Sequence, residues 1–145
     1  MANFVHYSPI FPFLAGIAFV ALIILFYFGL SREGWRSFAK RYPAPQKPAG
    51  TAYASPSTKF GLPGPHYSYG VKIIPCDSGL YFSAGLMSWA FHPPFLVPWT
   101  SVKRIVKIED IFDRYLIDIV DECGEIRTSL PGRAGKELSE RIGHG

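Results

Sequence analysis

Residues 9–30 form a run of 22 residues, PIFPFLAGIAFVALIILFYFGL, that contains no charged side chain. An α-helix rises about 1.5 Å per residue, so about 20 apolar residues match a hydrocarbon core that is about 30 Å thick. A helix also satisfies its own backbone hydrogen bonds, which lipid cannot do. The run therefore predicts a single N-terminal transmembrane helix over residues 9–30, which would place the chain in a lipid bilayer.

The residues that flank this run predict its orientation. Residues 1–8 carry no Lys or Arg, whereas basic residues follow the run at Arg32, Arg36, Lys40, Arg41 and Lys47. An excess of Lys and Arg stays on the cytoplasmic side, and the run is too long for a cleaved signal peptide. We therefore expect a single-pass protein of the bacterial inner membrane, with residues 1–8 outside and the C-terminal domain in the cytoplasm.

Residues 31–42 are predicted to form a basic amphipathic segment next to the membrane. Its apolar side chains have the spacing of one helical face (Trp35, Phe38, Ala39 and Tyr42). The candidates for contact with the membrane surface are Trp35, Arg36, Lys40 and Arg41. A simple flank of the membrane helix with incidental aromatic residues remains an alternative.

The remainder of the chain divides into a linker and a domain. Residues 43–66 are rich in Pro and Gly, which is typical of a linker, although residues 51–61 leave room for one edge strand. Residues 67–145 are predicted to form a small, mainly antiparallel β domain that ends in a short helix. The expected strands are 67–76, 80–91, 95–99, 101–108, 114–121 and 126–130, and the expected helix is 133–143.

Two sequence patterns carry a resemblance to known families. The segment GLYFSAGL, followed by FLVPWTSVKRIVKI and a terminal helix, resembles bacterial pleckstrin-homology or GRAM-type domains over residues 67–143. The whole chain also resembles small uncharacterised single-pass bacterial membrane proteins, on the patterns GW-x-x-x-A-x-x-Y and HPP-x-x-x-PW. The first hairpin, PCDSGLYF, carries Asp77 and no basic residue, which departs from domains of this kind that bind phosphoinositides.

Charge and composition exclude several classes of function. Residues 1–65 hold six basic residues and one acidic residue, whereas residues 66–145 hold nine basic and ten acidic residues. The positive charge therefore lies next to the apolar run, and we expect no nucleic-acid partner. The spacing of the two cysteines and four histidines fits no metal site, and no sequence motif for a cofactor or a catalytic group is present. Glu109, Asp110 and Asp113 are interpreted as a solvated hairpin tip.

Two functions of different kinds follow. The preferred one is a membrane-anchored, non-catalytic interaction module that presents its β domain to a protein partner, with Trp89, His92 and Trp99 as the candidate binding surface. The alternative is a protein that binds the membrane surface, or anionic lipid, through the basic aromatic flank. The small residues Ala15, Gly16, Ala18 and Ala21 would also permit self-association through the apolar helix, although a plain anchor is the simpler interpretation.

Overall fold

The computed structural model describes residues 9–32, 34–61, 66–85 and 92–142. Two helices come first, α1 (Ile10–Arg32) and α2 (Trp35–Arg41). The strands are β1 (Tyr53–Ser55), β2 (Thr58–Phe60), β3 (His66–Tyr67), β4 (Val71–Cys76), β5 (Gly79–Ala84), β6 (Phe95–Pro98), β7 (Val102–Ile108), β8 (Arg114–Asp121) and β9 (Gly124–Pro131). Short 3-10 turns η1 (Trp99–Ser101) and η2 (Gly132–Ala134) precede β7 and the last helix, α3 (Gly135–Ile142).

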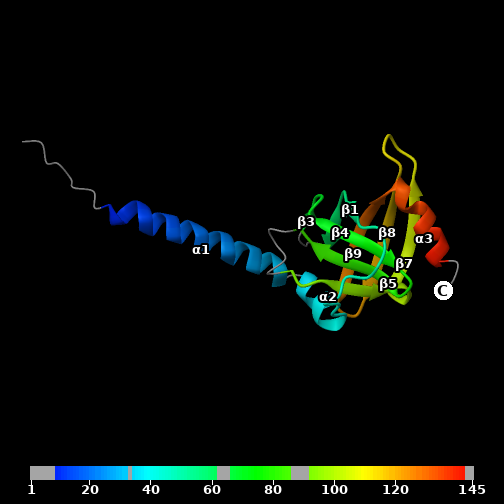
Figure 1. The fold of residues 1–145 in the computed structure, drawn as a ribbon, viewed down its shortest axis with the longest axis horizontal. Coiled ribbons are helices and arrows are strands. Elements are labelled where there is room, and N and C mark those ends of the chain that lie inside the picture. Colours follow the sequence, from blue (N-terminus) through cyan, green and yellow to red (C-terminus); the bar gives the residue numbers. More distant parts are fainter. Residues whose placement is uncertain (1–8, 33, 62–65, 86–91, 143–145) are drawn as a thin grey trace, which may run out of the picture.

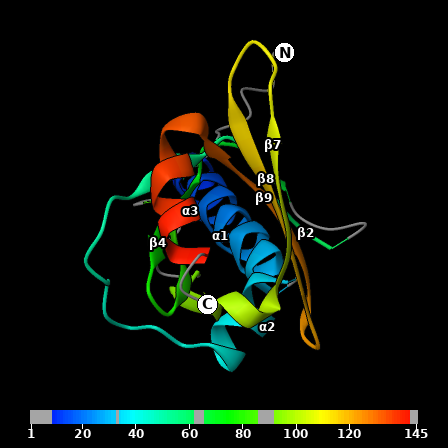
Figure 2. The same ribbon diagram turned by 90° about the vertical axis from the view of Figure 1, so that its right-hand side faces the viewer.

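The strands form two antiparallel sheets. The first sheet has the order β1-β4-β5-β6, and the second has the order β3-β2-β9-β8-β7. Strands β1 and β2 are separated only by Pro56 and Ser57, yet β1 pairs with β4 in the first sheet and β2 pairs with β9 in the second. This bent segment therefore joins the sheets, and Figures 1 and 2 show them packed against each other.

The two short helices close the space between the sheets. In α2, Trp35 and Phe38 are fully buried, and the Trp35 ring packs on Phe60 of β2 and Phe95 of β6. Leu138, on the apolar face of α3, is buried in the core. The core is continuous from α2 through both sheets to α3.

Helix α1 corrects the prediction of a transmembrane helix. It extends away from the β domain (Figure 1). Within the described part of the chain, no helix is both long enough and apolar enough to cross a membrane. This finding contradicts the predicted fold class of a membrane span plus a β domain, and with it the single-pass location in an inner membrane.

The predicted linker also differs from the structure. Residues 43–66 contain β1 and β2, and Tyr53 and Phe60 on these strands are buried in the core. Pro56 lies at the bend between the two strands, so neither strand has to accommodate a proline. The β domain therefore begins at α2 rather than at residue 67.

Candidate functional site

Of the three residues predicted as a partner-binding surface, the structure describes His92 and Trp99. Trp89 lies outside the described residues. His92 is only 1% exposed, and its Nε2 atom lies 3.0 Å from the hydroxyl of the half-buried Tyr67, whose pKa desolvation raises to about 12. Trp99 is half-buried and donates from Nε1 to the Cys76 carbonyl oxygen at 3.0 Å. Of these two described residues, His92 is therefore buried in the domain and Trp99 borders an accessible surface.

The four residues predicted to contact a membrane surface differ in how far their side chains are exposed. Trp35 is buried among aromatic rings, whereas Lys40 is exposed and Arg36 is half-buried. Arg41 forms ion pairs with Asp121 at 2.9 Å and with Glu122 at 3.3 Å. The aromatic face of α2 therefore packs on its own domain, and one of the predicted cations is already neutralised there.

Among the described residues, an accessible hollow lies between β7 and α3, and we call it the β7–α3 groove. Its volume is about 560 Å³. Its apolar lining consists of Trp99, Val102, Ile105 and Ile142, and its polar lining consists of Thr100, Lys103, Arg104 and Arg141. An apolar floor beside cationic side chains fits a segment that combines apolar and acidic residues.

Strand β7 is the edge of the second sheet on the side of this groove, since β8 is its only partner among the described strands. Its pairing shifts register between Val102 and Arg104, which leaves Lys103 as an extra residue in the strand. Such a bulge redirects side chains at the edge of a sheet. An edge strand also leaves backbone N–H and C=O groups unpaired, and a second extended chain can bind to them.

All of the charged side chains on β7 are basic. The strand carries Lys103, Arg104 and Lys107 and no acidic residue. Arg104 forms an ion pair with Asp118 of β8 at 2.7 Å, whereas Lys103 forms no ion pair with any described residue. Because Arg141 is paired with Asp77, Lys103 is the cation of the groove that is available to an external carboxylate.

A second unusual surface lies at the far end of β7, in the turn that joins it to β8. Residues 109–113 form this turn, which we call the β7–β8 tip, and Figure 2 shows it projecting beyond the two sheets. Ile111 is 93% exposed and Phe112 is 79% exposed. The Phe112 amide donates to the Asp110 carboxylate at 3.0 Å, which holds the turn. The tip was predicted to be polar, but it presents two large apolar side chains between acidic ones.

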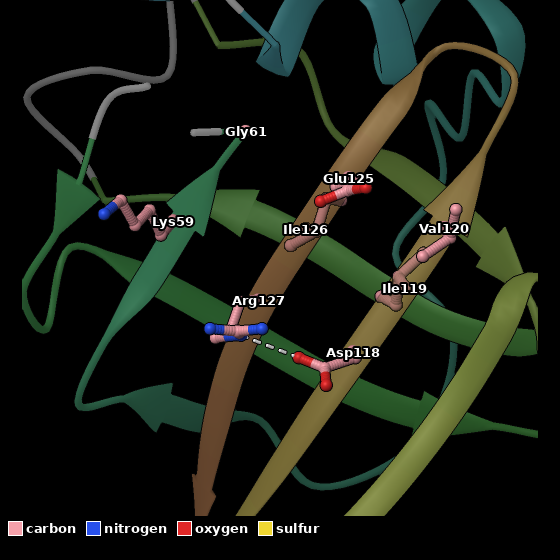
Figure 3. A pocket seen from close by; sticks show the side chains of 8 residues that line it. All are labelled: Lys59, Gly61, Asp118, Ile119, Val120, Glu125, Ile126 and Arg127. Carbon is pink, nitrogen blue, oxygen red and sulfur yellow. Dashed lines mark hydrogen bonds and ion pairs between the residues drawn. The ribbon is translucent and has the colours of Figure 1, made fainter. Parts of the chain in front are cut away.

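The outer face of the second sheet has a further hollow, shown in Figure 3, between β2, β9 and β8. Here Asp118 accepts hydrogen bonds at 2.9 Å from both Arg127 of β9 and Arg104 of β7. Lys59 lies beside Arg127 on the neighbouring strand. Because Asp118 and Glu125 balance Lys59 and Arg127 in this lining, the hollow offers no net charge to a ligand.

No family model, curated protein or solved structure matches this chain. The site is therefore assigned from geometry alone. Within the described ranges, no three His, Cys, Asp or Glu side chains come together as a possible metal site. Sequence reasoning identified Trp99 and strand 101–108, but it missed the groove, because α3 meets β7 only in the folded chain.

Proposed function

We propose that the β domain is a non-catalytic interaction module that binds an extended, acidic segment of a protein partner along the edge of β7. The observation that carries this proposal is the position of β7, a cationic strand with one edge unpaired among the described strands, directly beside the β7–α3 groove. Backbone hydrogen bonds to the edge would hold the segment, and alternate side chains would give specificity.

The chemistry of the segment follows from the groove. Acidic side chains would lie near Lys103, which has no ion-pair partner among the described residues. Apolar side chains would enter the groove between Val102, Ile105 and Ile142. Since successive residues of a strand point to opposite faces, an alternation of apolar and acidic residues suits both requirements.

The alternative function, binding to anionic lipid through the basic aromatic flank, receives less support. Trp35 was to be its aromatic anchor, but this side chain is fully buried. Arg41 was to contribute charge, but it is held by Asp121 and Glu122. The exposed Lys40 alone is a weak basis for attraction to a charged surface.

The proposal is tested by titrating the full-length, ¹⁵N-labelled chain with short synthetic peptides. A peptide of alternating Glu and Val should shift the backbone amide resonances of β7 and α3, and should bind more weakly as salt is added. The Lys103→Glu substitution should weaken binding by about 1 kcal/mol, and Lys72→Glu, a change of another exposed lysine on β4, should not. Equal binding of an alternating Lys and Val peptide, or shifts confined to other strands, would contradict the proposal.

A further inference from the structure

Resting on this proposed function, we infer that the segment bound at the β7 edge is the β7–β8 tip of a second copy of this chain. In the resulting dimer the two β7 strands pair antiparallel about a two-fold axis. Each copy then inserts its tip into the β7–α3 groove of the other, so both copies use the same surface. Such a two-fold contact closes on itself and does not extend into a filament.

The polarity of charge along β7 favours this arrangement. Lys103 and Arg104 stand at the start of the strand, and Glu109 and Asp110 follow its end. An antiparallel second copy brings the basic start of each strand beside the acidic end of the other. A parallel copy would align like charges, which is destabilising for residues directly opposite each other.

One register satisfies the charges and the apolar residues together. When Val106 lies opposite the Val106 of the other copy, the bulged start of one strand, with Lys103, lies beside the end of the other strand, where Glu109 begins the tip. The tip of each copy then lies beside η1 of the other, whose Trp99 and Thr100 line the β7–α3 groove. Phe112 and Ile111, which are almost fully exposed in one chain, then reach an apolar surface.

The tip cannot occupy the groove of its own chain. Six residues separate Ile105, in the groove, from Ile111, at the tip, and an extended strand rises about 3.3 Å per residue. The two surfaces are therefore about 20 Å apart along one strand, and pairing with β8 keeps that strand extended. Only a tip from another copy is able to reach the groove.

Lysines and bulges on an edge strand are a common protection against strand pairing. Lys103 and Lys107 fit that explanation, but the exposed Ile111 and Phe112 do not, because they add apolar surface at the same edge. The combination of a cationic edge and an acidic, apolar tip is complementary rather than uniformly repulsive. This complementarity distinguishes a specific two-fold contact from simple protection of the edge.

Disulfide trapping tests the contact directly. The Val106→Cys variant of the full-length chain, with Cys123→Ser also present, should form an intermolecular disulfide under mild oxidation. Val120→Cys in the same background is the matched control: Val120 is 41% exposed and Val106 is 39% exposed, and both lie on one face of the second sheet. Preferential cross-linking at position 106 supports the dimer. Equal cross-linking at both positions, or none at position 106, overturns it.

Exchange of charge between the copies gives a second test. Lys103→Glu alone and Glu109→Lys alone should each weaken self-association at least about tenfold, measured by analytical ultracentrifugation. An equimolar mixture of the two variants should associate again, since each altered residue then meets an opposite charge. Lys72→Glu is the control for net charge, and it should leave association unchanged. A mixture that stays as weak as the single variants overturns the inference.

These tests separate the inference from the proposed function. If Val106→Cys fails to cross-link while the alternating Glu and Val peptide still binds at β7, the edge serves a different protein and only the inference fails. If neither the peptide nor the second copy binds at β7, the proposed function fails as well. Glu109 is an exposed residue of the tip, and its ion pair with Lys107 at 3.2 Å joins two exposed side chains, so Glu109→Lys should leave the fold intact.

Discussion

The Trp35 indole donates from Nε1 to the carbonyl oxygen of Pro93 at 2.8 Å, which fastens α2 to the segment that leads into β6. The same ring lies 5.2 Å from the ring of His92 and 5.0 Å from that of Phe95. One side chain of α2 therefore fills the opening between the two sheets and also fixes the chain beside it.

Substitution of Trp35 should destabilise the domain strongly. Trp35→Ala removes a fully buried ring, and we expect it to lower the free energy of unfolding by about 3–5 kcal/mol. Trp35→Phe keeps an aromatic ring but leaves the Pro93 carbonyl oxygen without its donor, and it should cost about 1–3 kcal/mol. Denaturant unfolding measures both. Lys40→Ala, an exposed change on the same helix, should stay within about 0.5 kcal/mol of the wild type.

The bend between β1 and β2 depends on three buried hydroxyl groups. Thr58 and Thr128 are 2.8 Å apart at their Oγ1 atoms, and the Ser55 Oγ atom lies within 3.0 Å of both. Thr128→Val keeps the shape of the side chain but removes its hydroxyl, so we expect a loss of about 1–3 kcal/mol in thermal or denaturant unfolding. The same change at the exposed Thr100 should be close to neutral. Equal effects at the two positions would show that the buried hydroxyl groups do not hold the bend.

Asp121 makes the fold sensitive to acid. The Tyr42 hydroxyl, which donates to its carboxylate, is the main cause that lowers the pKa of Asp121 to about 2, and the Ser101 hydroxyl, the Cys123 amide and Arg41 add to the effect. In the unfolded chain this pKa is near 3.9. The carboxylate therefore contributes about 2 kcal/mol of stability above about pH 4, and this contribution disappears as the pH falls from about 4 to about 2.

Unfolding measured between pH 2 and pH 7 checks the role of Asp121. Asp121→Asn should be less stable than the wild type near neutral pH, and the difference should shrink below about pH 4. Tyr42→Phe should reduce the acid sensitivity, because the pKa of Asp121 moves towards its usual value. Glu122→Gln, a change at the exposed neighbouring residue, should leave the acid transition in place. An unchanged transition in Asp121→Asn would contradict this assignment.

Gly135 begins α3 at a point where only a glycine fits. A Cβ atom at this position would overlap the hydroxyl and ring of Tyr115 on β8. We expect Gly135→Ala to destabilise the domain by about 1–3 kcal/mol, because α3 has to move away from the second sheet. Shortening the side chain in the double variant Gly135→Ala, Tyr115→Leu should recover part of this loss. Gly85→Ala, where the nearest atom lies at an ordinary contact distance of 3.6 Å, serves as the control.

Much of the second sheet could be predicted from alternation of apolar and polar residues. Strands β7 and β8 lie within a residue of their expected bounds, since Ile117 and Ile119 face the core while Asp118 faces outward. The helix expected over residues 133–143 corresponds to η2 and α3. In these elements the local sequence pattern and the tertiary contacts favour the same secondary structure.

The rest depended on contacts between distant parts of the chain. Three-residue strands such as β1 and β2 are too short to show alternation, and they exist because β4 and β9 pair with them. The aromatic face of α2 was identified from its spacing, but the spacing does not reveal whether a face packs on lipid or on protein. The β7–α3 groove likewise forms from residues about 40 positions apart in the sequence.

The bent β1–β2 segment has a consequence for how the molecule opens. The three residues of β1 belong to the first sheet and the three residues of β2 belong to the second. Neither sheet is therefore able to separate from the other while both strands keep their pairing. Amide hydrogen exchange in β4, β5, β8 and β9 should therefore proceed through one shared opening event, with a common protection factor. A fragment that starts at residue 67 lacks the piece common to both sheets, and its amides should exchange at nearly the rate of an unfolded peptide.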